Sequence, residues 1–217
     1  VGRLLPQMLY YFSAWAEMRN RADEILFSVP SGNFGNLAAG LMAKATGLDG
    51  IGFLASTNAN DGVPQLLQSG QFTPRPSVPT LSSAMDVGDP SNLARILHLY
   101  GDNLSVLKKD LVGRSVSDKE TKECIRRTYD DLGYVLDPHT AVGLTALERE
   151  MKDRMQDLHD HLRSILKNDM ILLKTKVATL EQQDKEAYFP DEIYKKMVEK
   201  NPEVKNLRDQ LDLEIDF

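Results

Sequence analysis

One run of residues near the N-terminus restricts the fold more than any other feature of the chain. Glu24-Ile-Leu-Phe-Ser-Val-Pro30 is typical of a short buried strand ended by proline, and Ser31-Gly-Asn-Phe-Gly35 interrupts it. Residues 36–46 have the composition of a helix, and Gly50-Ile-Gly-Phe-Leu-Ala55 is a second apolar strand. Strand, loop, helix and strand in this order form a βαβ unit. The pattern therefore predicts an α/β fold, a parallel sheet with flanking helices.

The composition changes along the chain. All 14 glycines lie at or before Gly143, whereas 30 of the 70 residues from 148 to 217 are charged (13 Lys+Arg and 17 Asp+Glu). Turn-forming glycine is thus absent from the charged part. We therefore predict two parts, an α/β domain over residues 1–147 and a charged, mainly helical tail over residues 148–217.

Further elements are expected from local periodicity and from proline positions. Helices are predicted at 4–21, 62–69, 90–100, 117–132 and 148–167, and a short strand is predicted at Tyr134-Val-Leu136. In the tail, residues 171–177 could form a strand, and helices are predicted at 191–200 and after Pro202.

Charge and cysteine content exclude several classes of partner. A net charge of −6 gives no electrostatic reason to expect nucleic acid or an acidic membrane surface. The longest apolar runs fall short of a membrane span, and no metal-ligand set is predicted. The single cysteine, Cys124, fits a reducing compartment and is interpreted as a bystander thiol. These features predict a cytoplasmic protein.

The stretch Val29-Pro-Ser-Gly-Asn-Phe-Gly-Asn-Leu-Ala-Ala-Gly40 carries the clearest chemical signal. It joins a predicted strand to a predicted helix, whose N-terminus offers unpaired N–H groups and a partial positive charge. This arrangement favours a phosphate group. A tight βα connection without any ligand is the alternative, and the spacing matches neither a nucleotide P-loop nor a dinucleotide fingerprint.

Four blocks of this sequence resemble threonine synthases in order and spacing. They are Val29-Pro-Ser-Gly-Asn-Phe-Gly-Asn, Ser56-Thr-Asn-Ala-Asn-Asp61, Thr80-Leu-Ser-Ser-Ala-Met-Asp-Val-Gly-Asp-Pro-Ser-Asn92 and Tyr134-Val-Leu-Asp-Pro-His-Thr-Ala-Val-Gly143. The resemblance covers residues 1–147, and it indicates the C-terminal part of such an enzyme. It implies the fold of tryptophan-synthase-β-like enzymes, pyridoxal phosphate as cofactor, and a lyase reaction in threonine biosynthesis. That reaction converts O-phospho-L-homoserine and water to L-threonine and phosphate.

The resemblance also implies which residues contact the cofactor. The cofactor phosphate would be held by Ser31, Gly32, Asn33, Phe34, Gly35 and Asn36, mostly through backbone N–H groups. Thr140 would lie beside the pyridine nitrogen, and a neutral hydroxyl there would leave that nitrogen less protonated.

Other polar residues near these blocks have two interpretations each. His139 is a candidate general base, or a structural imidazole hydrogen-bonded beside the Asp137-Pro138 turn. Residues 58–61 follow a strand, where α/β folds bind ligands, but Asn and Asp also form turns. No chemical step is assigned to Ser82, Met85 or Asp86, and no catalytic residue is assigned.

The lysine that forms a Schiff base in this family belongs to a Ser-Phe-Lys-Asp-type motif in the N-terminal half, and that motif is absent here. Lys44 and Lys108 lack this context, and Lys44 is expected on a solvated helical face. We therefore expect the chain alone to be inactive. The alternative function is non-enzymatic, an α/β remnant whose helical tail binds a protein partner. Residues 151–217 weakly resemble the C-terminal end of a bacterial DNA polymerase gamma/tau subunit.

Overall fold

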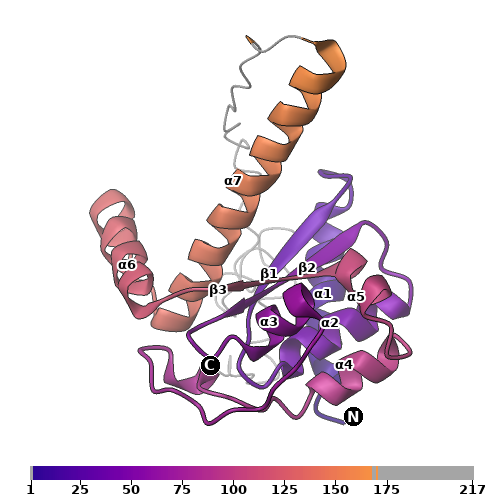
Figure 1. Ribbon diagram of the computed structural model, residues 1–217, viewed down its shortest axis with the longest axis vertical. Coiled ribbons are helices and arrows are strands. Elements are labelled where there is room, and N and C mark those ends of the chain that lie inside the picture. The colour runs from indigo at the N-terminus through magenta and orange to yellow at the C-terminus, as the bar shows by residue number, and fades with distance from the viewer. Residues whose placement is uncertain (1, 168–169, 171–217) are drawn as a thin grey trace, which may run out of the picture. The chain divides into compact units, whose positions relative to one another are not determined.

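The computed structural model describes residues 2–167 and residue 170 of the 217-residue chain (Figure 1). The predicted strand at 171–177, the later tail helices and most of the segment resembling a polymerase subunit lie outside the described residues. Within the described part, every helix is too short or too polar to cross a membrane.

Three parallel strands form the sheet, in the order β1-β2-β3. They are β1 (Ile25–Pro30), β2 (Ile51–Thr57) and β3 (Leu111–Ser115). Ile25 pairs with Ile51 across β1 and β2, and Phe53 pairs with Leu111 across β2 and β3. The predicted α/β fold with a parallel sheet is confirmed, and all three strands end at the same edge of the sheet.

The helices agree with most of the predicted elements. They are α1 (Leu5–Met18), α2 (Gly35–Ala45), α3 (Gly62–Ser69), the 3-10 turn η1 (Ser83–Met85), α4 (Leu93–Leu99), α5 (Leu104–Asp110), α6 (Asp118–Leu132) and α7 (Pro138–Leu166). Helix α5 and strand β3 were not predicted. Helix α7 runs through the predicted boundary at residues 147 and 148 without a break.

The strand predicted at Tyr134-Val-Leu136 is wrong. Tyr134 and Val135 are 63% and 66% exposed, and this segment pairs with no strand in the described part of the chain. Gly133 ends α6 in the left-handed conformation at φ 67°, and Asp137 caps α7 four residues later. An apolar run with no neighbouring strand has nothing to stabilise an extended pairing, so it forms a connection between two helices.

One face of the sheet packs against α1 and α2. The rings of Tyr11, Phe27 and Phe53 meet there, with centroids 5.1 Å apart for Tyr11–Phe27 and 5.6 Å for Tyr11–Phe53. Leu37 on α2 is fully buried in the same cluster. A Cβ atom on Gly40 would lie only 2.5 Å from the Phe53 ring, so this helix approaches the sheet closely because position 40 has no side chain.

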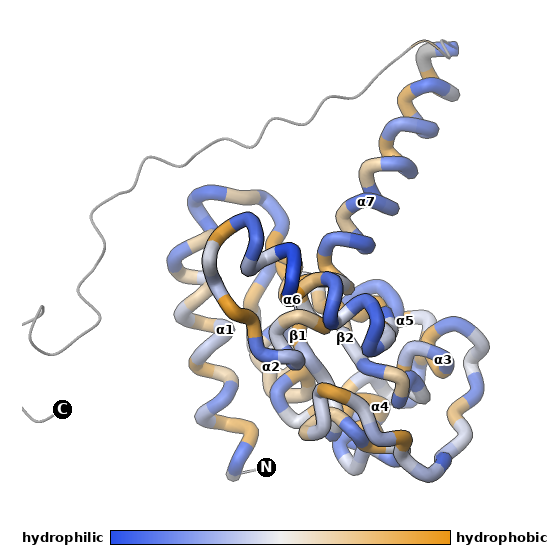
Figure 2. The backbone as a smooth tube through the Cα atoms, turned by 90° about the vertical axis from the view of Figure 1, so that its left-hand side faces the viewer, coloured by the Kyte–Doolittle hydropathy of each residue, from blue (hydrophilic) through white to orange (hydrophobic). Residues whose placement is uncertain are grey.

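Helix α7 covers part of the opposite face and then extends beyond the sheet, where its surface is mostly hydrophilic (Figures 1 and 2). Val142 and Ala146 are fully buried against Leu54 of β2. This contact places the first turns of α7 over the sheet, next to the carboxyl ends of the strands.

An ion-pair cluster anchors α7 to strand β3. The Glu150 carboxylate accepts hydrogen bonds from Nε and Nη2 of Arg114 at 3.0 and 2.9 Å, and from Nε of Arg154 at 2.9 Å. The Glu150 side chain is only 7% exposed. Burial tends to raise the pKa of Glu150, but the bonds from Arg154 and Arg114 outweigh it and lower the pKa below its ordinary value. The buried carboxylate is therefore charged and fully paired at neutral pH.

We expect Glu150→Ala to lower the free energy of unfolding by about 2–3 kcal/mol, because it leaves two partly buried guanidinium groups without their shared acceptor. Urea unfolding followed by circular dichroism measures this change. Glu148→Ala is the matched control. Its carboxylate pairs with Arg127 at the surface, with side chains 46% and 52% exposed, so its removal should cost less than about 1 kcal/mol. Equal losses for the two variants would contradict the proposed anchoring.

Candidate functional site

The loop between β1 and α2 comprises Ser31 to Phe34 and leaves the sheet at its carboxyl edge. The backbone N–H of Ser31 donates to the carbonyl oxygen of Ser56 at 2.8 Å, which continues the parallel ladder by one residue. Phe34, the residue before α2, has a left-handed backbone with φ 59°, and its side chain is 4% exposed. A buried ring thus holds the chain in a conformation that non-glycine residues seldom adopt.

The N-terminus of α2 has no side-chain cap. Helices α1, α3 and α4 likewise have none, whereas Asn103, Ser117 and Asp137 cap α5, α6 and α7 through their side chains. Among the described residues, no acceptor binds any of the backbone N–H groups from Gly32 through Leu37. Unpaired donors at a helix N-terminus, together with the helix dipole, form a binding site for an anion.

The polar side chains of the loop mostly serve the fold. The Ser31 hydroxyl donates to the carbonyl of Val29 at 2.8 Å and is buried, so it does not point outward as a free donor. The side-chain oxygen of Asn36 accepts a hydrogen bond from the Tyr11 hydroxyl. The Asn36 side-chain amide retains its N–H groups, for which no acceptor is found in the described part of the chain. Anion recognition in this loop therefore depends chiefly on the backbone.

Two residues that local sequence patterns did not single out hold Asn33 in place. Its side-chain oxygen accepts from the backbone N–H of Ser91 at 2.7 Å and from the Ser91 hydroxyl at 3.0 Å. The side-chain amide of Asn92 donates to the Asn33 carbonyl at 2.8 Å. The only sequence signal was that Ser91 and Asn92 close the third of the blocks resembling threonine synthases.

Gly32 and Gly35 let other parts of the chain approach the loop. A Cβ atom on Gly32 would lie 2.7 Å from the Cα of Met85 and 2.9 Å from the carbonyl oxygen of Ala84, which is closer than real contacts allow. A Cβ on Gly35 would meet only the side chains of Asn92, at 3.5 Å, and Leu4, at 3.9 Å, which are ordinary contacts. Glycine is thus required at position 32 by packing, but not at position 35.

The first turn of α7 lies at the same edge of the sheet as the loop. The Ser28 hydroxyl donates to the carbonyl of Gly143 at 2.7 Å, and a Cβ on Gly143 would lie 3.0 Å from the ring of Pro30. Thr140 is one turn earlier in the helix and is exposed. The start of α7, which includes Thr140, and the loop therefore both lie near the carboxyl end of β1.

The Thr140 hydroxyl is engaged in capping α7. It donates to one carboxylate oxygen of Asp137, while the backbone N–H groups of His139 and Thr140 donate to the other at 2.9 and 3.2 Å. The bond from the Thr140 hydroxyl outweighs burial and lowers the pKa of Asp137 to about 2. Because the hydroxyl proton is directed to Asp137, Thr140 presents only oxygen lone pairs to a ligand.

The other candidates take mainly structural positions. Nδ1 of His139 lies 3.1 Å from the Asp137 carboxylate, as expected for a structural imidazole, and its buried Nε2 has no partner in the described residues. Asp61 pairs with Arg75. The Lys44 ammonium pairs with Asp110 at 2.8 Å and is only 26% exposed, so its expected place on a solvated face is wrong.

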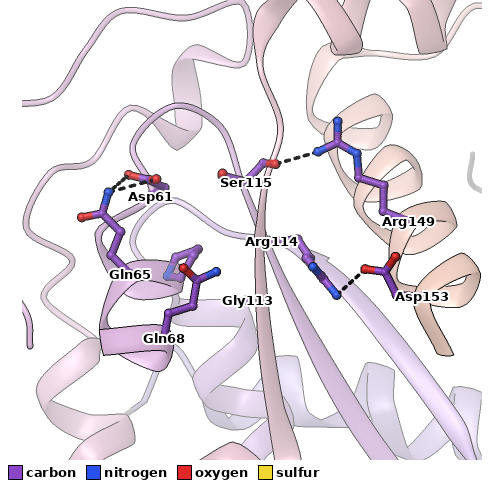
Figure 3. A pocket seen from close by; sticks show the side chains of 9 residues that line it. Asp61, Gln65, Gln68, Gly113, Arg114, Ser115, Arg149 and Asp153 are labelled. Atoms are coloured by element: carbon purple, nitrogen blue, oxygen red, sulfur yellow. Dashed lines mark hydrogen bonds and ion pairs between the residues drawn. The ribbon is translucent and has the colours of Figure 1, made fainter. Parts of the chain in front are cut away.

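A polar pocket of about 290 Å³ lies beside β3, between α3 and α7 (Figure 3). Arg149 donates to the Ser115 carbonyl at 3.2 Å, and Arg114 pairs with Asp153 at 2.8 Å. Gln65 donates to Asp61. The charged groups that line this pocket are thus compensated within the protein, unlike the backbone donors of the β1–α2 loop.

Threonine synthases are similar to this chain along about 70% of its length. The enzyme of Serratia marcescens is 45% identical over 154 residues, which are 70% of this chain and 35% of that protein. The crystal structure of Escherichia coli threonine synthase has a TM-score of 0.61 at 43% identity, covering 68% of this chain and 34% of the enzyme. The pyridoxal-phosphate-bound threonine synthase of Brucella melitensis has a TM-score of 0.62 at 30% identity, covering 68% and 37%.

The chain thus spans about a third of the length of the relatives it matches. In the tail, residues 187–216 match a domain of unknown function (DUF8493).

We expect Gly32→Ala to displace the loop or the facing turn and to destabilise the protein by about 1–3 kcal/mol, because the new methyl group would overlap backbone atoms. Thermal unfolding measures the loss. Gly2→Ala is the control, since a Cβ there meets nothing within 4 Å. An unchanged midpoint for Gly32→Ala would contradict the packing described above.

The cap of α7 predicts a specific dependence of stability on pH. Because the pKa of Asp137 is lowered from 3.8 to about 2, its contribution is fully present above about pH 4 and is lost as the pH falls toward 2. Asp137→Asn keeps a capping side chain but cannot titrate. The variant should therefore lose less stability than the wild type between pH 4 and 2, as measured by urea midpoints at each pH. Parallel curves for the two proteins would show that this cap does not carry the effect.

Proposed function

We propose that this chain provides the part of a pyridoxal-phosphate-dependent threonine synthase that binds the phosphate and the pyridine ring of the cofactor. The observation that carries the proposal is the run of unpaired backbone N–H groups from Gly32 to Leu37 at the uncapped start of α2. Similarity to threonine synthases over this region supports the same assignment. The substrate of the intact enzyme would be O-phospho-L-homoserine.

The residues of the loop fit a phosphate group. The backbone N–H groups of Gly32, Asn33, Phe34 and Gly35, with the free N–H groups of the Asn36 side chain, would donate to its oxygens. The Ser31 hydroxyl would act indirectly, because it holds the Val29 carbonyl. When bound, pyridoxal phosphate supplies an electron sink for carbanion chemistry.

The hydrogen bond between Thr140 and Asp137 would determine how the Thr140 hydroxyl contacts the pyridine nitrogen. Its proton is directed to Asp137, so the hydroxyl oxygen can accept a hydrogen bond but not donate one. A ring nitrogen that carries a proton fits this arrangement, in contrast to the less protonated nitrogen that the sequence resemblance implies. An unprotonated nitrogen would require Thr140 to release Asp137.

Among the residues that the structure describes, no lysine near the proposed cradle is placed to act as the Schiff-base lysine. Lys44 reaches the carbonyl of Ile51 and Asp110 at the amino edge of the sheet. Lys108 lies on α5, directly before β3, and so also near the amino edge. We propose that the chain alone holds the cofactor without a covalent bond and does not turn over substrate, and that the Schiff-base lysine comes from a region corresponding to the rest of the relatives' length.

A separate function is proposed for the tail. We propose that residues 148–217 form a charged, mainly helical module that binds a protein partner in the cytoplasm, as the resemblance to a polymerase gamma/tau subunit suggests. Its support is the composition of the tail, with 30 charged residues of 70 and no glycine. This is the non-enzymatic alternative for the chain as a whole.

Titration calorimetry with pyridoxal phosphate tests the proposed cradle. We expect saturable binding that inorganic phosphate competes away, and binding of pyridoxal, which lacks the phosphate, weaker by about tenfold or more. Gly35→Asp places a carboxylate at the first residue of α2, where it favours the helix but repels an anion, so affinity should fall by more than about tenfold.

Gly35→Ala is the matched control for the added Cβ atom, which has room at this position. Its affinity should stay within about threefold of the wild type. Equal affinities of wild type and Gly35→Asp for pyridoxal phosphate would rule out this loop as the phosphate site.

A further inference from the structure

A polar cluster lies directly after β2, beside the proposed cradle. Asn58 and Asn60 are 1% and 5% exposed. The Asp86 carboxylate accepts hydrogen bonds from the side-chain amides of Asn58 at 2.8 Å and Asn60 at 3.2 Å. It also accepts from the Thr80 hydroxyl at 2.7 Å and the Thr80 backbone N–H at 3.0 Å. Within the described residues no cation contacts this carboxylate, and its four bonds all come from uncharged donors.

The cluster fixes the course of the chain from Val78 to Asp86. The side-chain oxygen of Asn60 accepts from the Val78 N–H at 2.7 Å, and its amide donates to the Val78 carbonyl at 2.9 Å. The amide of Asn58 lies 3.1 Å from the hydroxyl of Ser82, which is 1% exposed. Residues at the end of β2 therefore hold a segment about twenty residues further along the chain, at its start and at its end.

The backbone of that segment is in close contact with the loop. The turn η1, Ser83–Met85, is bounded by Ser82 and Asp86 of the cluster. Its Met85 Cα and Ala84 carbonyl would lie 2.7 and 2.9 Å from a Cβ on Gly32. Met85 itself is 3% exposed. This contact is between backbone atoms, so no flexible side chain can absorb a shift. The position of Gly32 therefore depends on the position of the turn.

The chain that follows this segment contacts the loop a second time, where Ser91 and Asn92 bond with Asn33. Residues 84–92 thus contact two successive residues of the loop, Gly32 and Asn33. Asp86 lies in this segment, and the hydrogen bonds that it accepts fix the course of the segment.

We propose that Asp86 is a positioning residue for the phosphate-binding loop. It holds η1 against Gly32, and so keeps the loop's N–H groups directed at one point, without touching the anion. This inference rests on the proposed function of the loop as a phosphate cradle. The inference assigns a role to Asp86, for which the sequence alone indicated no chemical step.

Asp86→Asn tests the proposal in the full 217-residue chain. The variant replaces one accepting oxygen by an NH₂ group. In either orientation of the new amide this group faces donors that it cannot bond with, the amides of Asn58 and Asn60 or the Thr80 N–H. Asp131→Asn on the exposed surface of α6 is the control, since it removes the same charge elsewhere. Asp86→Glu, which keeps the carboxylate, is the conservative variant.

Two measurements are made on each protein. Calorimetry gives the affinity for pyridoxal phosphate, which should weaken by about tenfold or more in Asp86→Asn and recover in part in Asp86→Glu. Amide hydrogen exchange without ligand should accelerate by about tenfold at Ser31, which anchors the loop, and by less than about threefold at Phe53 in the core of β2. The control should match the wild type in both.

Each outcome has one meaning. Unchanged exchange at Ser31 with faster exchange at Met85 would show that the cluster holds only its own turn, and would overturn the proposal. An equal acceleration at Ser31 and Phe53 would show a purely global effect and would also overturn it. A wild-type chain that binds no pyridoxal phosphate would refute the proposed cradle, whereas the exchange comparison would still decide whether Asp86 positions the loop.

Discussion

Parallel pairing of the three strands is the constraint on which the rest of the structure depends. Because β1, β2 and β3 run in the same direction, the segments that follow them all emerge at one edge. The β1–α2 loop, the cluster around Asn58 and the start of α7 are brought together there, although they lie far apart in the sequence. A ligand at this edge would therefore meet donors from several elements, as ligands do in other open α/β sheets.

Strong local signals could be predicted from the sequence, whereas elements that depend on distant partners could not. Strands β1 and β2 and helix α2 were predicted within about two residues, since apolar runs are bounded there by Pro30, Gly35 and Gly47. Strand β3, Leu-Val-Gly-Arg-Ser, has only two apolar residues and was missed, because pairing with β2 rather than its own composition makes it a strand.

The candidate site was predictable in position but not in detail. Glycines between a strand and a helix located the loop. The hydrogen bonds that hold Asn33 in place could not be predicted from local sequence, because the bond from Ser91 to Asn33 joins residues 58 positions apart. Ser31 was expected among the residues that hold the phosphate, but its hydroxyl donates to the Val29 carbonyl. Since side-chain oxygens in the loop serve the fold, most of the free donors belong to the backbone, whose N–H groups are present at every residue except proline.

The hydrogen bond from the Thr140 hydroxyl to Asp137 also affects the stability of helix α7. Any ligand that needs this proton must take it from the cap, so binding would weaken the N-terminus of α7 while occupying the site beside it. Thermodynamic coupling of this kind is reciprocal. Formation of the cap would lower the affinity for such a ligand by the same factor by which the bound ligand destabilises the cap. A ligand that only donates to Thr140 would leave the helix undisturbed, so the rigidity of α7 would report the protonation state of its ligand.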